Sequence, residues 1–281
     1  MIQLNKKARH YNGGAKKGDK KVKCKIERIE EKLRNGETIY GTHSAMGGAV
    51  TTEIYGTVGF DALWIDMEHG CIDKKDLLTA IIGAAGSDMV TFVRVPWNDM
   101  VQVKPILEMG CDGIIFPMIT TAEEARYAVA SCAYPPEGVR GFGPCRCIQY
   151  GKIDAQDYIH NYSKKIWKIV QIEHIKAVEN LDEILKVDGI NMFIIGPCDL
   201  SGSMGLLAQT KHPDVKAVMD GIAAKLKAAG KPFGVSMGYD EEAIRDWVRR
   251  GASFLFADND INYLYNGSAN TLNNLKRLSN S

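Results

Sequence analysis

The stretch LWIDMEHG at residues 63–70 joins an apolar run to three ionisable side chains and ends at a glycine. Side chains alternate between the two faces of a strand, so Asp66 and Glu68 are expected on one face and His69 at the start of the following loop. An acid beside a histidine at the end of an apolar strand can set the tautomer and basicity of a proton acceptor. A polar strand end whose charges are simply solvated is the alternative, and the motif by itself leaves both interpretations open.

Short apolar runs of this kind recur along the chain and alternate with amphipathic segments. Eight of them are predicted to be strands, at residues 38–43, 62–67, 89–95, 113–118, 166–173, 191–196, 232–237 and 253–257. Helical spacing predicts a first helix from Ile26 and others at residues 74–85, 100–109, 122–133, 177–185, 213–229 and 241–250. Eight strands separated by helices predict an α/β fold, a (β/α)8 TIM barrel, over residues 26–281, which agrees with the usual length of ~250 residues. A doubly wound open sheet is the alternative, but no GxGxxG motif follows the first predicted strand.

Three segments fall outside the repeating pattern. Residues 1–25 carry nine Lys or Arg and one Asp, which predicts a flexible basic arm. Residues 134–165 are too long for a simple crossover and are expected to form a lid or a subunit contact. Residues 264–281 hold leucines at helical spacing, which predicts an exposed C-terminal helix that packs on another subunit.

Composition limits the class of protein. The 281 residues carry a net charge of +1, with 45% hydrophobic and 25% charged residues, so no global charge attracts nucleic acid or a membrane surface. Seven cysteines are scattered without a CxxC pair, which favours a reducing cytoplasm over a disulfide framework or a zinc site. The N-terminus has no apolar leader and no run approaches ~18 apolar residues, so we expect neither secretion nor membrane insertion.

Polar residues gather where the predicted strands end, which is the face that carries the active site in barrel enzymes. Glu173 and Asp199 end consecutive strands and could hold Mg²⁺ or Mn²⁺ through carboxylate oxygens, the alternative being an ion pair between Glu173 and Arg94. The planar guanidinium of Arg94 could bind an oxyanion or form a structural salt bridge. No lysine ends a predicted strand, which disfavours Schiff-base chemistry. Further polar residues at strand ends are His43, Gln171, Ser236 and Asp258.

Five motifs resemble those of the HpcH/HpaI aldolases, which are metal-dependent (class II) pyruvate aldolases of the phosphoenolpyruvate/pyruvate barrel superfamily. The motifs are WIDMEHG at 64–70, VRVPWND at 93–99, YPPEGVRG at 134–141, QIE at 171–173 and IGPCDLS at 195–201. The resemblance implies reversible cleavage of a 4-hydroxy-2-oxo acid, as in 4-hydroxy-2-oxoheptanedioate aldolases, to pyruvate and an aldehyde through a metal-bound pyruvate enolate. It implies Mg²⁺ or Mn²⁺, or else Co²⁺, as cofactor. It also implies a homo-oligomer, either a hexamer or a trimer of dimers, with exchanged C-terminal helices.

The resemblance assigns roles to individual residues. Asp66 and His69 match the base dyad of the family, and Arg94 matches the arginine that stabilises the pyruvate enolate. Glu173 and Asp199 match the acids that hold the metal ion. These assignments imply that proton transfer and charge stabilisation take place at the same barrel mouth.

Other matching positions are expected to bind the substrate. Gln171 matches a glutamine that lines the site, and the backbone at Cys198 and Asp199 matches the stretch that binds the pyruvate carboxylate. Three departures from the family pattern fall near the expected aldehyde end and leave the identity of the aldehyde open. They are His43, where tryptophan is common, Glu108, where aspartate is common, and Ser236, where an aliphatic residue is found.

Two other functions stay open. A lyase acting on a malyl- or citramalyl-type thioester would share the metal and the enolate, but it would need a basic cluster for coenzyme A, which the sequence lacks outside residues 1–25. A barrel that binds a keto acid without turnover is the second. The combination of Asp66, His69, Arg94, Glu173 and Asp199 speaks against it, because packing requires none of these residues.

Overall fold

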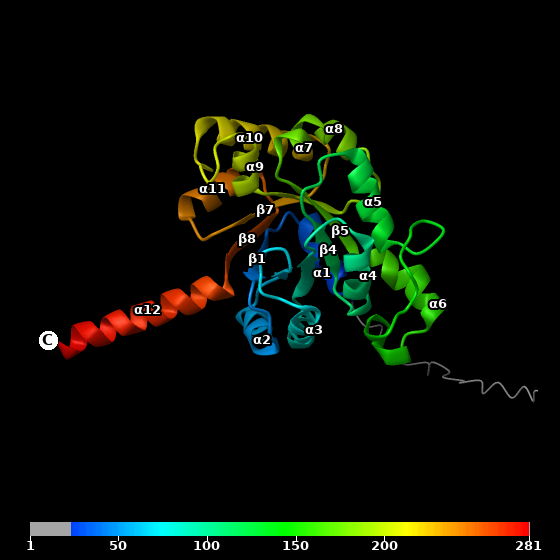
Figure 1. Ribbon diagram of the computed structural model, residues 1–281, viewed down its shortest axis with the longest axis horizontal. Coiled ribbons are helices and arrows are strands. Elements are labelled where there is room, and N and C mark those ends of the chain that lie inside the picture. Colours follow the sequence, from blue (N-terminus) through cyan, green and yellow to red (C-terminus); the bar gives the residue numbers. More distant parts are fainter. Residues whose placement is uncertain (1–23, 281) are drawn as a thin grey trace, which may run out of the picture.

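A closed barrel of eight parallel strands forms the centre of the computed structural model, which describes residues 24–280 (Figure 1). The strands follow one another around the barrel in chain order, and the last pairs with the first. Their bounds are β1 (Ile39–Ser44), β2 (Ala62–Asp66), β3 (Val90–Arg94), β4 (Gly113–Phe116), β5 (Trp167–Ile172), β6 (Met192–Ile195), β7 (Phe233–Met237) and β8 (Phe254–Asn259). The predicted (β/α)8 barrel is therefore confirmed, and each predicted strand overlaps an observed one.

Both faces of the barrel wall are buried, because alternate residues of each strand point to opposite sides. On β2, Trp64 points into the barrel interior, whereas Leu63 and Ile65 pack against the surrounding helices. Glycine makes room where an interior ring is large: a Cβ on Gly41 would lie 2.4 Å from the Phe256 ring. The interior is therefore a packed core and not a channel, so a substrate can enter only at the end where polar side chains replace the apolar ones.

Helices surround the barrel and connect successive strands (Figure 1). The longer ones begin and end at residues that suit helix termini, as in the capping box formed by Thr121 and Glu124 and the left-handed Gly251 after Arg250. Their bounds are α1 (Lys25–Arg34), α2 (Ala49–Val58), α3 (Lys74–Gly83), α4 (Met100–Glu108), α5 (Ala122–Cys132), α7 (Ile175–Glu179), α8 (Leu181–Ile184), α9 (Pro197–Ser203), α10 (Pro213–Ala228), α11 (Glu241–Arg250) and α12 (Asp260–Ser279). None of the helices within residues 24–280 has the length and apolar character needed to cross a membrane.

Helix α1 closes the end of the barrel opposite the polar rim. Ile26 and Ile29 insert into the interior cluster, and Arg28 and Lys32 both form ion pairs with Asp61 just before β2. The predicted basic arm at residues 1–25 falls almost entirely outside the described residues, because only its last two positions are described.

Two regions differ from the sequence-based prediction. Helix α2 was not predicted, because its sequence AVTTEIYGTV holds three threonines, two valines and a glycine, all weak helix formers. Residues 134–165, expected as one long functional loop, contain the short helical segments η2 (Arg146–Gly151), α6 (Ala155–Asp157), η3 (Tyr158–Tyr162) and η4 (Ser163–Lys165). Tertiary packing, which the local sequence does not show, decides both cases.

The C-terminal helix α12 extends away from the barrel (Figure 1). Asp260, its first residue, is its only buried residue among those described. The Asp260 carboxylate accepts hydrogen bonds from Ser44 Oγ and from the backbone N–H groups of Ala45 and Met46, which fixes the loop after β1. The predicted exposed helix is therefore confirmed, and its packing on another subunit stays a prediction.

Candidate active site

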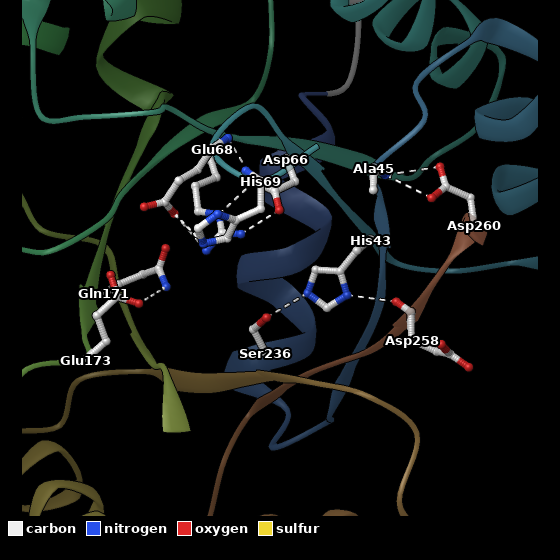
Figure 2. A network of polar contacts seen from close by, with 11 residues as sticks. His43, Ala45, Asp66, Glu68, His69, Gln171, Glu173, Ser236, Asp258 and Asp260 are labelled. Carbon is white, nitrogen blue, oxygen red and sulfur yellow. Dashed lines mark hydrogen bonds and ion pairs between the residues drawn. The ribbon is translucent and has the colours of Figure 1, made fainter. Parts of the chain in front are cut away.

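The carboxyl ends of the strands bring a set of polar side chains together at one mouth of the barrel (Figure 2). These side chains replace the apolar layers below them and continue the inward-facing positions of strands β1, β2, β3, β5 and β7. They are His43, Asp66, Arg94, Gln171, Glu173 and Ser236, whereas Asp258 contributes its backbone oxygen. The parallel arrangement of the strands therefore produces the convergence that the sequence predicted.

Arg94 holds two carboxylates at this mouth. Its Nε and Nη2 atoms donate to the two Asp66 oxygens at 2.9 and 2.5 Å, and its Nη1 atom lies 2.9 Å from Glu68 Oε2. The guanidinium also lies over the Trp64 ring, with its central carbon 5.1 Å from the ring centroid. The alternative ion pair between Arg94 and Glu173 is not what the structure shows. Asp66 takes that place because it lies opposite Arg94 in the register of β2 and β3.

Within the described residues, the structure shows no direct contact between the Asp66 carboxylate and the His69 ring, so the dyad of these two residues stays a prediction. The Asp66 carboxylate accepts a hydrogen bond from the His69 backbone N–H at 3.3 Å, while the His69 ring lies 3.7 Å from Glu68 Oε2 and is mostly exposed. Burial would raise the pKa of Asp66, but the hydrogen bonds from Arg94 and from two backbone N–H groups outweigh it and hold that pKa below its ordinary value. Asp66 is therefore a charged anchor for Arg94, and Glu68 is the carboxylate nearest to the His69 ring.

Glu173 is buried and its two oxygens are held by separate donors. Oε1 accepts from the Met118 backbone N–H at 2.7 Å, and Oε2 accepts from Gln171 Nε2 at 2.7 Å. Met118 has a left-handed φ of 53°, which is strained for a residue with a side chain and turns its N–H toward the carboxylate. Burial and the nearby charges of Glu68 and Asp199 raise the pKa of Glu173 to about 7.

Asp199 reaches the same side of the mouth from the first turn of α9. It lies three positions after Gly196, whose missing side chain leaves room for Glu173: a Cβ on Gly196 would lie 2.7 Å from Glu173 Oε2. Cys198 and Asp199 are both exposed. Partial burial of the thiol is the main cause of the raised pKa of Cys198, and the Asp199 carboxylate adds to it. A raised pKa disfavours a thiolate nucleophile.

The residues at the mouth fit a divalent cation. Within residues 24–280, no group of three or more His, Cys, Asp or Glu side chains is arranged to hold a metal ion. Glu173 and Asp199 could supply two hard oxygen ligands, which would leave positions open for water or a substrate. Burial is the main cause of the raised pKa of Glu173, and the charges of Glu68 and Asp199 add to it, so a cation beside this carboxylate would favour its charged form.

His43 and Ser236 form a second polar group at the mouth, apart from Gln171 and Glu173 (Figure 2). His43 Nε2 lies 2.8 Å from Ser236 Oγ, and His43 Nδ1 lies 2.8 Å from the Asp258 backbone oxygen. Burial lowers the pKa of His43, so the ring is neutral near pH 7. The structure thus brings two of the three expected aldehyde-contacting residues to the mouth.

Glu108, the third, is not brought there within this chain. It ends α4, and a helix that leads into a parallel strand finishes at the opposite end of the barrel from the strand ends. Its carboxylate instead pairs with the buried Arg140 of the 134–165 segment at 3.0 Å, and it accepts from Cys147 Sγ. Glu108 therefore anchors that segment, which is a correction to its expected role.

Four site features had no assigned role in the sequence analysis. They are the Glu68 carboxylate, the Met118 backbone N–H, the side-chain-free Gly196 and the Asp258 backbone oxygen. Of these, only Glu68 gave a usable signal, because it lies two positions after Asp66 and the strand period predicts a shared face. The other three act through backbone conformation or through a missing side chain, which residue type alone does not reveal.

Comparisons with known proteins point to one family of enzymes. A family model described as HpcH/HpaI aldolase/citrate lyase matches residues 41–261. The chain is 36% identical over 243 residues to a hydroxypyruvate/pyruvate aldolase from Roseobacter denitrificans, covering 86% of this chain and 94% of that protein. It is 35% identical over 242 residues to a 4-hydroxy-2-oxo-heptane-1,7-dioate aldolase from Salmonella dublin, covering 85% of this chain and 91% of that protein.

A solved structure has the same architecture. The crystal structure of an HpcH/HpaI aldolase/citrate lyase family protein from Burkholderia cenocepacia J2315 superposes with a TM-score of 0.82 at 29% identity. The superposition covers 89% of this chain and 99% of that one.

Proposed function

This chain belongs to the HpcH/HpaI aldolase/citrate lyase family and is a carbon–carbon lyase of the aldolase type, and from this premise we propose that it reversibly cleaves a 4-hydroxy-2-oxo acid to pyruvate and an aldehyde. The family resemblance deduced from the five sequence motifs is confirmed by the same matches. The two named relatives differ in their printed substrates, so the proposal specifies pyruvate and leaves the aldehyde to be argued from this chain's own residues.

The observation that carries the proposal is that two acids, Glu173 and Asp199 (the acid cluster), lie at the same mouth as the fixed guanidinium of Arg94. Glu173 and Asp199 would hold Mg²⁺, Mn²⁺ or Co²⁺, and the chemistry that a bound divalent ion supplies is polarisation of the pyruvate keto group. Arg94 is held in place by Asp66 and Glu68, so its donors are preorganised for negative charge that develops on the keto oxygen. Arg94 would thereby stabilise the enolate oxygen during carbon–carbon bond formation and cleavage.

His69 is the proposed proton carrier. Its ring is exposed at the mouth and lies beside Glu68, so Glu68 would set its orientation while Asp66 fixes the loop through the His69 backbone N–H. Removal of a methyl proton from pyruvate and its return would both take place at an imidazole nitrogen. The start of α9, at Cys198 and Asp199, would receive the pyruvate carboxylate through backbone N–H groups.

Gln171 has a positioning role in this scheme. Its Nε2 atom donates to Glu173, and among residues 24–280 its buried Oε1 atom has no hydrogen-bond partner. A buried amide oxygen without a donor is costly, and water or a substrate hydroxyl at the mouth would supply one. The amide would therefore orient the Glu173 carboxylate on one side and a bound ligand on the other.

The proposal is tested by exchange of the pyruvate methyl protons in deuterated buffer, followed by NMR. Exchange is expected with the purified enzyme and Mg²⁺ or Mn²⁺, is expected to stop with a chelator, and is expected to return when the metal is restored. Glu173→Gln should exchange at least ~10²-fold more slowly, whereas Glu183→Gln, an exposed control, should match the wild type. Exchange that continues unchanged in chelator or in Glu173→Gln would refute the metal-dependent mechanism.

We also propose that the chain acts as a homo-oligomer in the cytoplasm. Ile261, Leu264, Leu272 and Leu275 fall on one face of α12 at 100° per residue and are all exposed, and a second copy of the chain is the proposed partner for this face. All seven cysteines are free thiols, which supports a reducing compartment.

A further inference from the structure

We propose that His43 and Ser236 select the aldehyde, so that this enzyme prefers an uncharged hydroxyaldehyde over an apolar aldehyde and over one that carries a carboxylate. This inference rests on the proposed function and specifies the class of its second substrate. The two residues hydrogen-bond to each other at the mouth, and both were identified from sequence as departures from the family pattern.

The hydrogen bonds around His43 fix its tautomer. The Asp258 backbone oxygen can only accept, so His43 Nδ1 must carry the proton of their 2.8 Å hydrogen bond. A neutral imidazole then has a bare Nε2, and the Ser236 hydroxyl must donate its proton to it. The residue that carries this oxygen, Asp258, has a left-handed φ of 62°, which is a strained conformation for a residue with a side chain.

The consequence is that Ser236 offers lone pairs, and no proton, to a ligand. Its hydroxyl proton is already engaged by His43, and burial lowers the pKa of His43, so the pair stays uncharged near neutral pH. A hydroxyl group on the ligand can donate to Ser236 Oγ, whereas a methyl group in the same place would leave the oxygen without a donor.

Ser236 lies at the right distance from the acid cluster to contact the second substrate. Ile172 pairs with Ile195 and Ile195 with Val235, so the residues that follow them, Glu173, Gly196 and Ser236, are expected at one level on adjacent strands. Two strand spacings amount to about 10 Å, and Gly196 contributes no side chain between them. Pyruvate at the acid cluster would therefore leave a gap of a few atoms before Ser236, which suits a short aldehyde.

A carboxylated aldehyde would need a cation of its own at the mouth. The guanidinium of Arg94 is already engaged by Asp66 and Glu68, and its role toward the substrate is with the enolate oxygen of pyruvate. The cavity of about 240 Å³ that begins at Cys198 and Ser236 does have cations on its outer wall. Each of these pairs with an acid, as Lys211 does with Asp240, Lys216 with Asp246 and Arg250 with Asp220.

The test compares three aldehydes of similar size with pyruvate and Mg²⁺, measured as kcat/KM for condensation. Glycolaldehyde and propanal differ by a hydroxyl in place of a methyl, and glyoxylate carries a carboxylate. The wild type should prefer glycolaldehyde over propanal by about five- to tenfold, the range expected for one hydrogen bond, and should use glyoxylate least. Equal kcat/KM values for glycolaldehyde and propanal, or a preference for glyoxylate, would overturn the inference.

Variants assign the preference to Ser236. In Ser236→Ala the ratio of the glycolaldehyde and propanal kcat/KM values should fall to within twofold of one, and Ser236→Thr, which keeps the hydroxyl, should restore it. Ser253→Ala is the matched control, because it removes a serine hydroxyl at the other end of the adjacent strand β8 and should keep the wild-type ratio. A ratio that survives in Ser236→Ala refutes the assignment.

Pyruvate methyl exchange distinguishes failure of this inference from failure of the proposed function. Metal-dependent exchange without selectivity among the aldehydes leaves the proposed function standing and removes only the role of His43 and Ser236. Loss of both exchange and condensation in the wild-type enzyme removes the proposed function and this inference with it.

Discussion

Arg94 binds both oxygens of Asp66 across the β2–β3 pair, at 2.9 and 2.5 Å, and still reaches Glu68 with its third nitrogen. The pair is more than a strand-end salt bridge, because both partners are over nine-tenths buried and the guanidinium also stacks over Trp64. Two carboxylates and an aromatic ring thus fix the orientation of one cation at the barrel mouth. That orientation is what preorganised charge stabilisation requires.

Replacing Arg94 with lysine should show whether exchange depends on the positive charge alone or also on the planar donor geometry of the guanidinium. A lysine ammonium keeps the positive charge but cannot donate to both oxygens of Asp66 and to Glu68 in one plane. We expect pyruvate methyl exchange to fall by about 10²-fold or more while the fold is retained. NMR of the exchange reaction and circular dichroism of the variant measure the two properties.

The control for that variant is Arg245→Lys, at an exposed pair with Glu241 on α11. It should leave the exchange rate at the wild-type value. A purely structural role for Arg94 would give the opposite pattern in Arg94→Lys, namely a lower free energy of unfolding with an unchanged exchange rate.

The pKa of about 7 for Glu173 gives the metal-free protein a defined pH dependence. Between the unfolded value near 4.3 and about pH 7, the folded state binds more protons than the unfolded state, so the free energy of unfolding falls as pH rises through this window. The full change is about 4 kcal/mol. Thermal unfolding in chelator at several pH values should show this decrease in the wild type and lose it in Glu173→Gln.

Added divalent ion should reverse the trend. Proton and metal compete for the same carboxylate, so the rise in Tm caused by Mg²⁺ or Mn²⁺ should be small at pH 5 and larger at pH 8. Glu183→Gln, at an exposed glutamate, should keep the wild-type pH profile. A metal-induced rise in Tm of the same size at both pH values would contradict the buried, proton-binding Glu173.

The fold was predictable because the strand and helix periods appear directly in the sequence. Interior and exterior residues of β2 alternate as period two requires, and only α2, with its threonines and valines, was missed among the longer helices. Helix direction could also have placed Glu108 correctly, since the predicted helix at 100–109 must finish at the end of the barrel where β4 begins. The error arose because the motif position was used without that direction.

The site was only partly predictable, because residue types alone do not determine which charged side chains pair with each other. Sequence placed Asp66, Arg94 and Glu173 at one mouth but could not show that Arg94 pairs with Asp66 and not with Glu173. That choice follows from the β2–β3 register and from burial. The Met118 N–H donates to Glu173 because Met118 has a left-handed φ. The sequence around Pro117 does not predict this conformation.

Adding one methyl group at Gly196 should displace the Glu173 carboxylate without replacing either proposed metal ligand. The new Cβ of Gly196→Ala would lie 2.7 Å from Glu173 Oε2 and 2.8 Å from Glu173 Cβ, so the carboxylate must move. We expect metal affinity to fall by about 10- to 100-fold, the range seen when the support of a ligand is disturbed. Titration with Mn²⁺ followed by electron paramagnetic resonance measures the affinity directly.

Gly221→Ala provides the comparison for Gly196→Ala. A Cβ at Gly221 meets no atom within 4 Å in the described residues, and the position lies inside α10. This change should leave Mn²⁺ affinity unaltered and raise the free energy of unfolding by roughly 0.5–1 kcal/mol. Equal Mn²⁺ affinity in the two variants would show that Glu173 does not depend on the space at Gly196.

The exposed apolar face of α12 should determine the oligomeric state. Leu272 and Leu275 are 51% and 61% exposed on a helix that leaves the barrel, which is unusual for leucine unless another chain covers it. The double change Leu272→Asp and Leu275→Asp should shift the sedimentation coefficient toward a smaller species at equal protein concentration. The matched control, Asn270→Asp with Asn274→Asp, adds the same charge on the other face of α12 and should sediment as the wild type. If the leucine variants and the control sediment alike, α12 does not join the copies.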